Sequence, residues 1–273
     1  MRVALVTGST DGIGKATAEL LGRRGWHVVV VGRSRDRCEA VVAGIVREGG
    51  SAEARVADLA RMADVRRLAD EVLAAHARLD ALVLNANAIT QERRVTDEGF
   101  EANLAVGFLG RTLLQWALEA RLAATPRAQV LTVVGLDHER LDLANPQLAT
   151  GYSAWHALKR WQWAVQVLAR EANRRGTTPT NVFMPGLVKT KILADEPQPM
   201  RVLVQLATLV IGIPVERSAE EVVGVLDRVR AEGLRDSYFA RSAVKPPRQL
   251  KTSAADGPAL WTWAEETLRP WSR

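Results

Sequence analysis

The sequence predicts an α/β fold: a doubly wound, parallel sheet of about seven strands with helices on both faces. Two observations predict it. Short apolar, β-branched runs alternate with amphipathic helical patterns along the chain, as parallel sheets require. The chain has 273 residues and is 47% hydrophobic, enough to cover both faces of such a sheet. We therefore expect a single domain over residues 1–273, with a lid-like apolar region at about 191–216.

The predicted strands follow one another in order, with helical patterns between them. They cover residues 3–6, 27–31, 52–57, 81–84, 129–134, 180–184 and 237–239. Two helix starts carry capping signals. Asp58 suits the N-cap of a helix at 61–76, and Ser218 with Glu221 resembles the capping box of a later helix.

Composition and charge exclude several classes of protein. Cys38 is the only cysteine, so we expect no disulfide, no cysteine-based metal site and a reducing, cytoplasmic location, and we assign no metal ligands. The sequence contains no apolar run of 18 residues or more and no signal peptide, which argues against a membrane span. The net charge is +6, but the basic residues alternate with acidic ones, as at 61–78. This pattern argues against a nucleic-acid partner, while a positive field attracts an anionic cofactor.

The first predicted strand runs directly into a glycine-rich turn and a helix. Glycines let the backbone approach a pyrophosphate, and the helix N-terminus offers free N–H groups. An ordinary tight turn is the alternative. The candidate cofactor residues here are Thr7, Gly8, Ser9, Thr10, Gly12, Ile13 and Gly14.

The spacing Gly-x-x-x-Gly-x-Gly after Thr7 resembles the short-chain dehydrogenase/reductase family. The resemblance implies a Rossmann-type sheet that binds NAD(H) or NADP(H). Arg33, at the tip of the second strand, favours NADP(H), because an arginine can pair with its 2′-phosphate. By the same resemblance, the remaining cofactor residues are Asp58 and Leu59 near the adenine, Asn85, Ala86 and Asn87 after the fourth strand, and Pro185, Gly186, Val188 and Thr190 near the nicotinamide.

The resemblance weakens at the reaction centre. Family catalysis uses an Asn, a Ser, a Tyr and a Lys. The segment 96–110 is similar to one in the retinol-dehydrogenase-like branch, and there the Asn falls on Gly107; Asn103 lies about one helical turn earlier. Val134 and Gly135 occupy the serine positions.

The Tyr-x-x-x-Lys pair admits three registers. They are Tyr152 with His156, Trp155 with Lys159, and Leu158 with Gln162. The lead-in at residues 145–155 is similar to that of the same branch and favours the third. In that register all four catalytic groups are missing.

The sequence therefore favours an NADP(H)-binding enzyme that acts on a small apolar molecule by non-standard chemistry: a cyclase, isomerase or eliminase, or a reductase with a substituted acid. Its candidate acids and bases are Tyr152, His138, His156 and Asp137. An ordinary NADPH-dependent ketoreductase or alcohol dehydrogenase using Tyr152 is the alternative. A catalytically silent NADP(H)-binding partner protein is a third.

The helix that carries these registers is rich in tryptophan. Trp155, Trp161 and Trp163 give it a wide apolar face. This face predicts core packing together with a homodimer interface, or else an aromatic wall for a polycyclic or polyene substrate.

Overall fold

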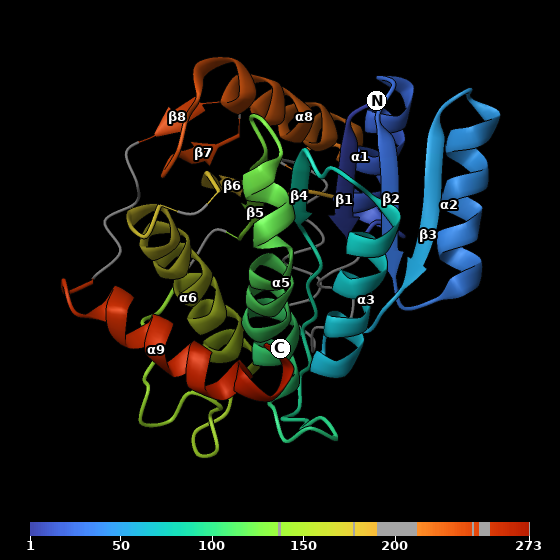
Figure 1. Ribbon diagram of the computed structural model, residues 1–273. Coiled ribbons are helices and arrows are strands. Elements are labelled where there is room, and N and C mark those ends of the chain that lie inside the picture. The colour runs from blue at the N-terminus through green and yellow to red at the C-terminus, as the bar shows by residue number, and fades with distance from the viewer. Residues whose placement is uncertain (136–137, 177, 190–211, 242, 246–251, 273) are drawn as a thin grey trace.

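The computed structural model describes residues 1–135, 138–176, 178–189, 212–241, 243–245 and 252–272 (Figure 1). The strands are β1 Val3–Thr7, β2 His27–Gly32, β3 Ser51–Val56, β4 Ala81–Leu84, β5 Gln129–Val133, β6 Thr180–Met184, β7 Tyr238–Ala240 and β8 Ala243–Lys245. The helices are α1 Gly12–Arg23, α2 Arg35–Arg47, α3 Met62–Ala75, α4 Ala102–Leu104, the π-helical turn η1 Ala105–Leu109, α5 Gly110–Ala124, α6 Ala154–Arg174, α8 Val215–Glu232, α9 Asp256–Leu268 and the 3₁₀ turn η3 Arg269–Trp271.

The strands form one sheet in the order β3-β2-β1-β4-β5-β6-β7-β8. The doubly wound fold is confirmed, but the described sheet has eight strands where about seven were expected, and β8 is antiparallel to β7. The order reverses between β1 and β4, which are direct neighbours in parallel register. In open α/β sheets, ligands bind outside the carboxyl ends of the strands at such a reversal.

The two faces of the sheet bury separate apolar cores, because side chains alternate along each strand. Leu5 and Val29 contribute to a core shared with α3, α5, α6 and α9. Val6 and Val28 contribute to a second core, under α1, α2 and α8 (Figure 1). Because helices cover both faces of the sheet, the ends of the strands are where a ligand could bind.

Two predicted helix caps are wrong, although the helix expected at 61–76 is observed within one residue of those bounds. Helix α3 has Arg61 at its N-cap with no side-chain cap, and Asp58 instead accepts a hydrogen bond from the Ala60 amide at 3.0 Å. Helix α8 begins at Val215, after Pro214, so Ser218 is buried inside the helix and caps nothing. In neither case does the predicted residue cap the helix.

Most of the predicted lid at 191–216 lies outside the described residues. The described segments that come before and after residues 190–211 meet, because Val188 and Ile213 form a parallel bridge. In the part of the chain that is described, no helix combines the length and the apolar character that crossing a bilayer demands.

Candidate active site

The glycine-rich turn after β1 packs tightly against the turn after β4. Gly8 has φ of +65°, and a Cβ added to it would lie 2.8 Å from the Cα of Ala86. A Cβ on Gly14 would lie 2.3 Å from the Gly8 carbonyl oxygen. Side chains at these two positions would push the turns apart. The turn therefore has the bare backbone and the helix N-terminus that a pyrophosphate group needs.

The polar side chains of this turn hold its shape. The Thr7 hydroxyl accepts hydrogen bonds from the amides of Asn85 at 2.9 Å and Ala86 at 3.0 Å. The Asn85 side chain donates back to the Thr7 carbonyl at 3.1 Å. The Ser9 hydroxyl is buried between β1 and β2, donating to Val6 and accepting from the Val31 amide, both at 2.8 Å. These residues serve the site by positioning backbone.

The tip of β2 lies beside the same turn. Thr10 covers Gly32 so closely that a Cβ there would lie 2.5 Å from the Thr10 methyl carbon. Arg33 follows with its side chain exposed, while Arg35 is paired with Glu39 at 3.6 Å. A guanidinium at this position has the charge and the reach to pair with a phosphate.

The other predicted cofactor residues border the same edge of the sheet. Asp58 is half-buried and Leu59 is buried, its carbonyl oxygen against Gly110 at the start of α5. Asn87 is half-buried after β4. Gly186 has φ of +86° after β6, and Thr190 lies outside the described residues.

The positions where the sequence resemblance placed the family's catalytic Asn and Ser have neighbouring side chains packed against them. Gly107 lies in the π-helical turn η1, and a Cβ there would lie 2.5 Å from the indole ring of Trp161. Gly135 follows β5, and a Cβ there would lie 2.8 Å from the amide oxygen of Gln162. Val134 and Gln162 are both buried, and Leu158 packs against the core.

Tyr152 lies just before α6, and its hydroxyl forms a polar cluster with Thr90 and Asn103, here called the tyrosine cluster. The hydroxyl donates to the Thr90 carbonyl at 2.7 Å and accepts from the Asn103 side-chain amide at 2.8 Å. Asn103 is 1% exposed and also binds Glu101. Burial raises the pKa of Tyr152, and the nearby Glu101 carboxylate raises it further.

The other candidate acids and bases do not join this cluster through any described hydrogen bond. His156 is exposed and binds Glu139 through Nδ1 at 2.6 Å. His138 is half-buried, and Asp137 lies outside the described residues.

The tryptophan-rich helix divides its three indoles between the core and the surface. Trp161 and Trp163 are 1% and 2% exposed, whereas Trp155 is 40% exposed. Because two of the three rings are enclosed, they do not form the open aromatic wall that was one expectation.

Arg111 on α5 is a site residue that sequence reasoning missed. Its guanidinium donates to the carbonyls of Ala86 at 2.7 Å and Val133 at 2.8 Å, and so joins the ends of β4 and β5. It stacks on the Trp161 ring at 4.8 Å. Complete burial lowers its pKa to about 9, which still leaves it charged at neutral pH.

Comparison with known proteins decides the family. The profile described as short chain dehydrogenase matches residues 2–201. The chain belongs to the short-chain dehydrogenase/reductase family. Its fold agrees: a metagenomic short-chain oxidoreductase in complex with NADP superposes with a TM-score of 0.65 at 25% identity, over 88% of this chain and 96% of that one.

Several relatives within this family are named as dehydrogenases. Mouse polyprenol dehydrogenase is 33% identical over 277 residues, which cover 97% of this chain and 82% of that protein. Human retinol dehydrogenase 13 is 30% identical over 200 residues, which cover 70% of this chain and 60% of that protein. The resemblance to the retinol-dehydrogenase-like branch is therefore confirmed, and the chain is an oxidoreductase by lineage.

Three residues of this short-chain dehydrogenase/reductase were not predicted from the sequence as site residues: Asn103, Thr90 and Arg111. Asn103 was set aside because it precedes the family position by about one turn, yet a buried amide must bind something. Thr90 and Arg111 stand in no motif, and their partners lie 62 and 22 residues along the chain.

Proposed function

We propose that this chain is a nicotinamide-dependent oxidoreductase that prefers NADP(H) and interconverts a carbonyl and an alcohol on a small apolar molecule. Tyr152 would exchange the proton with the substrate oxygen. One observation carries the proposal: the Tyr152 hydroxyl is held by Asn103 and Thr90, and Thr90 lies on the segment that leaves the β4 turn. This is the hypothesis of an ordinary reductase, which the relatives favour over the hypothesis of non-redox chemistry.

The residues that are present fit the cofactor. The tight packing of Gly8 and Gly14 leaves backbone where a pyrophosphate would lie. Arg33 would pair with the 2′-phosphate, and the segment at 185–188 would border the nicotinamide. The bound cofactor supplies the hydride; the chain supplies binding, orientation and the proton.

The tyrosine cluster suits proton donation. Because burial raises the pKa of Tyr152, its hydroxyl keeps its proton at neutral pH. The Asn103 amide already donates to this oxygen, and that hydrogen bond grows stronger as the oxygen gains negative charge. The Tyr152 hydroxyl now donates its proton to the Thr90 carbonyl, and it would turn to donate that proton to a substrate oxygen. A protonated hydroxyl is the form that reduction of a carbonyl requires, because the product oxygen must gain a proton.

The substrate class follows from the relatives and from the apolar sequence at 191–216. Proteins named for polyprenol and retinol act on isoprenoid alcohols. We propose an apolar aldehyde or ketone, with an isoprenoid aldehyde as the first compound to test.

Non-redox chemistry is the second candidate, and one observation favours it. In the register that the sequence favours, the family's catalytic positions fall on Gly107, Val134 or Gly135, Leu158 and Gln162, and none of these side chains is an acid or a base. A cyclase or isomerase that accelerates its reaction by orientation alone needs none.

One experiment separates the two candidates. Purified wild-type protein is titrated with NADPH by fluorescence, and NADPH oxidation is then followed with a panel of apolar aldehydes and ketones. We expect binding and turnover in the wild type. Tyr152→Phe should lose about 10²–10⁴-fold in kcat/KM with an unchanged NADPH Kd, the usual contribution of a positioned acid.

Tyr238→Phe is the matched control, because Tyr238 is the only other tyrosine and lies in β7. It should keep turnover within a few-fold. Absence of NADPH binding would overturn the cofactor assignment. Full turnover by Tyr152→Phe would overturn the role of Tyr152, and conversion of a substrate without NADPH oxidation would establish the second candidate.

A further inference from the structure

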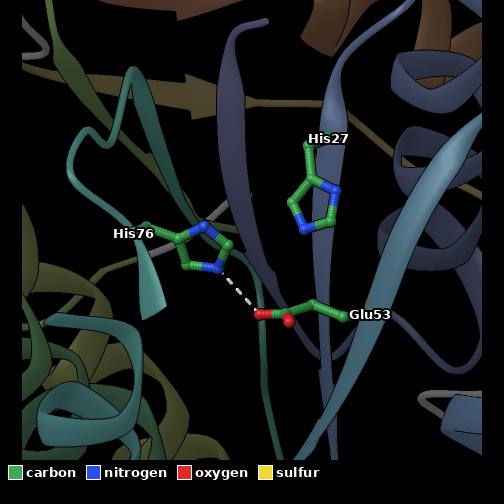
Figure 2. Close-up of side chains that lie close together, drawn as sticks. All are labelled: His27, Glu53 and His76. Atoms are coloured by element: carbon green, nitrogen blue, oxygen red, sulfur yellow. Dashed lines mark hydrogen bonds and ion pairs between the residues drawn. The ribbon is translucent and has the colours of Figure 1, made fainter. Parts of the chain in front are cut away.

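His27, Glu53 and His76 form a cluster far from the candidate active site, here called the histidine cluster (Figure 2). His27 is the first residue of β2, Glu53 lies in β3, and His76 follows the last residue of α3. The cluster therefore lies toward the amino ends of the strands, whereas the glycine-rich turn lies at their carboxyl ends. One nitrogen from each histidine and one carboxylate oxygen all lie within 4.8 Å of one another.

The imidazole of His27 has one nitrogen occupied and one free for a ligand. Its Nδ1 lies 2.8 Å from the hydroxyl of Ser51, which is its register partner on β3. With the proton on Nδ1 and donated to Ser51, Nε2 carries a lone pair. Nε2 is buried and has no hydrogen-bond partner among the described residues. A buried acceptor without a partner is costly in a folded protein, so this atom requires an explanation.

The other two side chains face His27 (Figure 2). His76 Nε2 lies 2.7 Å from Glu53 Oε1, and the two rings are 5.2 Å apart. Arg55 contacts the other carboxylate oxygen of Glu53 at 3.0 Å. Metal-binding histidines and carboxylates are usually oriented by such outer contacts, which Ser51 and Arg55 provide here.

We propose that the histidine cluster binds one divalent transition-metal ion of the Zn²⁺ type. Two imidazole nitrogens and one carboxylate oxygen are a common three-ligand set for Zn²⁺, with water in the fourth position. Mg²⁺ and Ca²⁺ prefer oxygen ligands alone, so the two nitrogens exclude them. The side chains of His76 and Glu53 are 12% and 24% exposed, which leaves an entry path for the ion.

The geometry needs only small side-chain movements. Ligand atoms of a tetrahedral Zn²⁺ lie about 3.3 Å apart, given bonds of about 2.0–2.1 Å. His76 Nε2 and Glu53 Oε1 would separate slightly from 2.7 Å, and His27 Nε2 would move closer. The ion would join β2, β3 and the end of α3. Its role would be to stabilise this edge of the sheet, since it lies away from the proposed reaction centre.

Zinc titration tests the proposal directly. The full chain, prepared without a histidine tag and freed of metal, is titrated with ZnCl₂ in competition with a chromogenic chelator. We expect one high-affinity Zn²⁺ per chain, no displacement by excess MgCl₂, and a rise in Tm when ZnCl₂ is present. His76→Gln and His27→Gln should each weaken Zn²⁺ binding at least 10-fold and abolish the rise in Tm.

His156→Gln is the matched control. His156 forms a pair with Glu139 at 2.6 Å, the same two chemical groups without a second histidine, and it should leave the Zn²⁺ affinity unchanged. Circular dichroism of each variant distinguishes lost binding from lost folding, and Glu53→Gln provides a third substitution should His27→Gln fail to fold. A wild-type protein that binds no Zn²⁺ at tens of micromolar would overturn the proposal. Equal weakening by His156→Gln and His76→Gln would also overturn it.

Discussion

Gly107 and Trp161 show how one buried side chain limits what can stand at a neighbouring position. The indole of Trp161 occupies the space beside Gly107 that any side chain would need, and its other neighbour is the Arg111 guanidinium. The position of the Trp161 ring thus requires a glycine at position 107. An asparagine at position 107, where the sequence resemblance placed the family's catalytic Asn, would require the buried Trp161 ring to move.

Substituting Gly107 tests this packing. We expect Gly107→Ala to lower the free energy of unfolding by about 1–3 kcal/mol, the usual cost of overpacking a core, and Gly107→Asn to lower it further. The measurement is urea denaturation. Gly44→Ala is the control, because that glycine lies inside α2 with nothing within 4 Å of an added Cβ. It should stabilise the protein by about 0.5–1 kcal/mol, and equal losses at both sites would contradict the explanation.

Helix α3 shows how a distant loop can determine where an element begins. The Glu98 carboxylate accepts hydrogen bonds from the amides of Met62 at 2.6 Å and Ala63 at 3.0 Å. Glu98 thus takes the role that Asp58 was expected to play. Its negative charge also lies at the positive end of the helix dipole.

Removing this carboxylate should destabilise the helix. We expect Glu98→Ala to cost about 1–2 kcal/mol of unfolding free energy, as the loss of an N-cap does. Chemical denaturation of the purified variants provides the measurement. Asp97→Ala is the neighbouring control, because its side chain is exposed, and it should change stability by less than about 0.5 kcal/mol. A similar cost at Asp97 would point to loop charge instead of capping.

Asp80 joins three parts of the whole molecule. Its buried carboxylate accepts from the Val3 amide at 3.0 Å, from Arg78 at 2.6 Å, and from Arg230 of α8 at 3.4 Å. Burial alone would raise the pKa of Asp80, but the hydrogen bonds from Arg78 and Val3 outweigh it and hold the pKa below its usual value.

This lowered pKa predicts a pH dependence of stability. A carboxyl group with a lower pKa in the folded state stabilises the protein fully above its unfolded pKa of about 3.9 and loses that contribution as the pH falls through the folded value. We expect Asp80→Asn to cost about 1–3 kcal/mol at pH 7 and at pH 5, and less toward pH 3. The measurement is urea denaturation at the three pH values.

Asp227→Asn is the comparison for Asp80. Asp227 pairs with Arg24 at 2.7 Å, but both side chains are 45% exposed. Solvent screens such a pair, so its removal should cost less than about 1 kcal/mol at every pH. A cost at Asp80 that does not change between pH 7 and pH 3 would show that ionisation of this group is not linked to folding.

The sequence by itself determined the features that depend on neighbours along the chain. The apolar runs specified the strands that were expected, and the glycine spacing after Thr7 specified the turn and the family. Gly8 and Gly14 are required by close backbone contacts within one strand-turn-helix unit and the strand beside it. Such local requirements leave a fixed spacing in the sequence, and a spacing can be recognised without a structure.

Only the tertiary structure decided which polar groups meet. Tyr152 and Asn103 are 49 residues apart, and Arg230 reaches Asp80 across 150 residues. His76 and Glu53 are brought together by the packing of α3 on the sheet. These contacts depend on strand order and on the depth of each side chain, which a residue's neighbours in sequence do not encode. The hydrogen bonds of Tyr152 and the histidine cluster therefore became visible only in the folded chain.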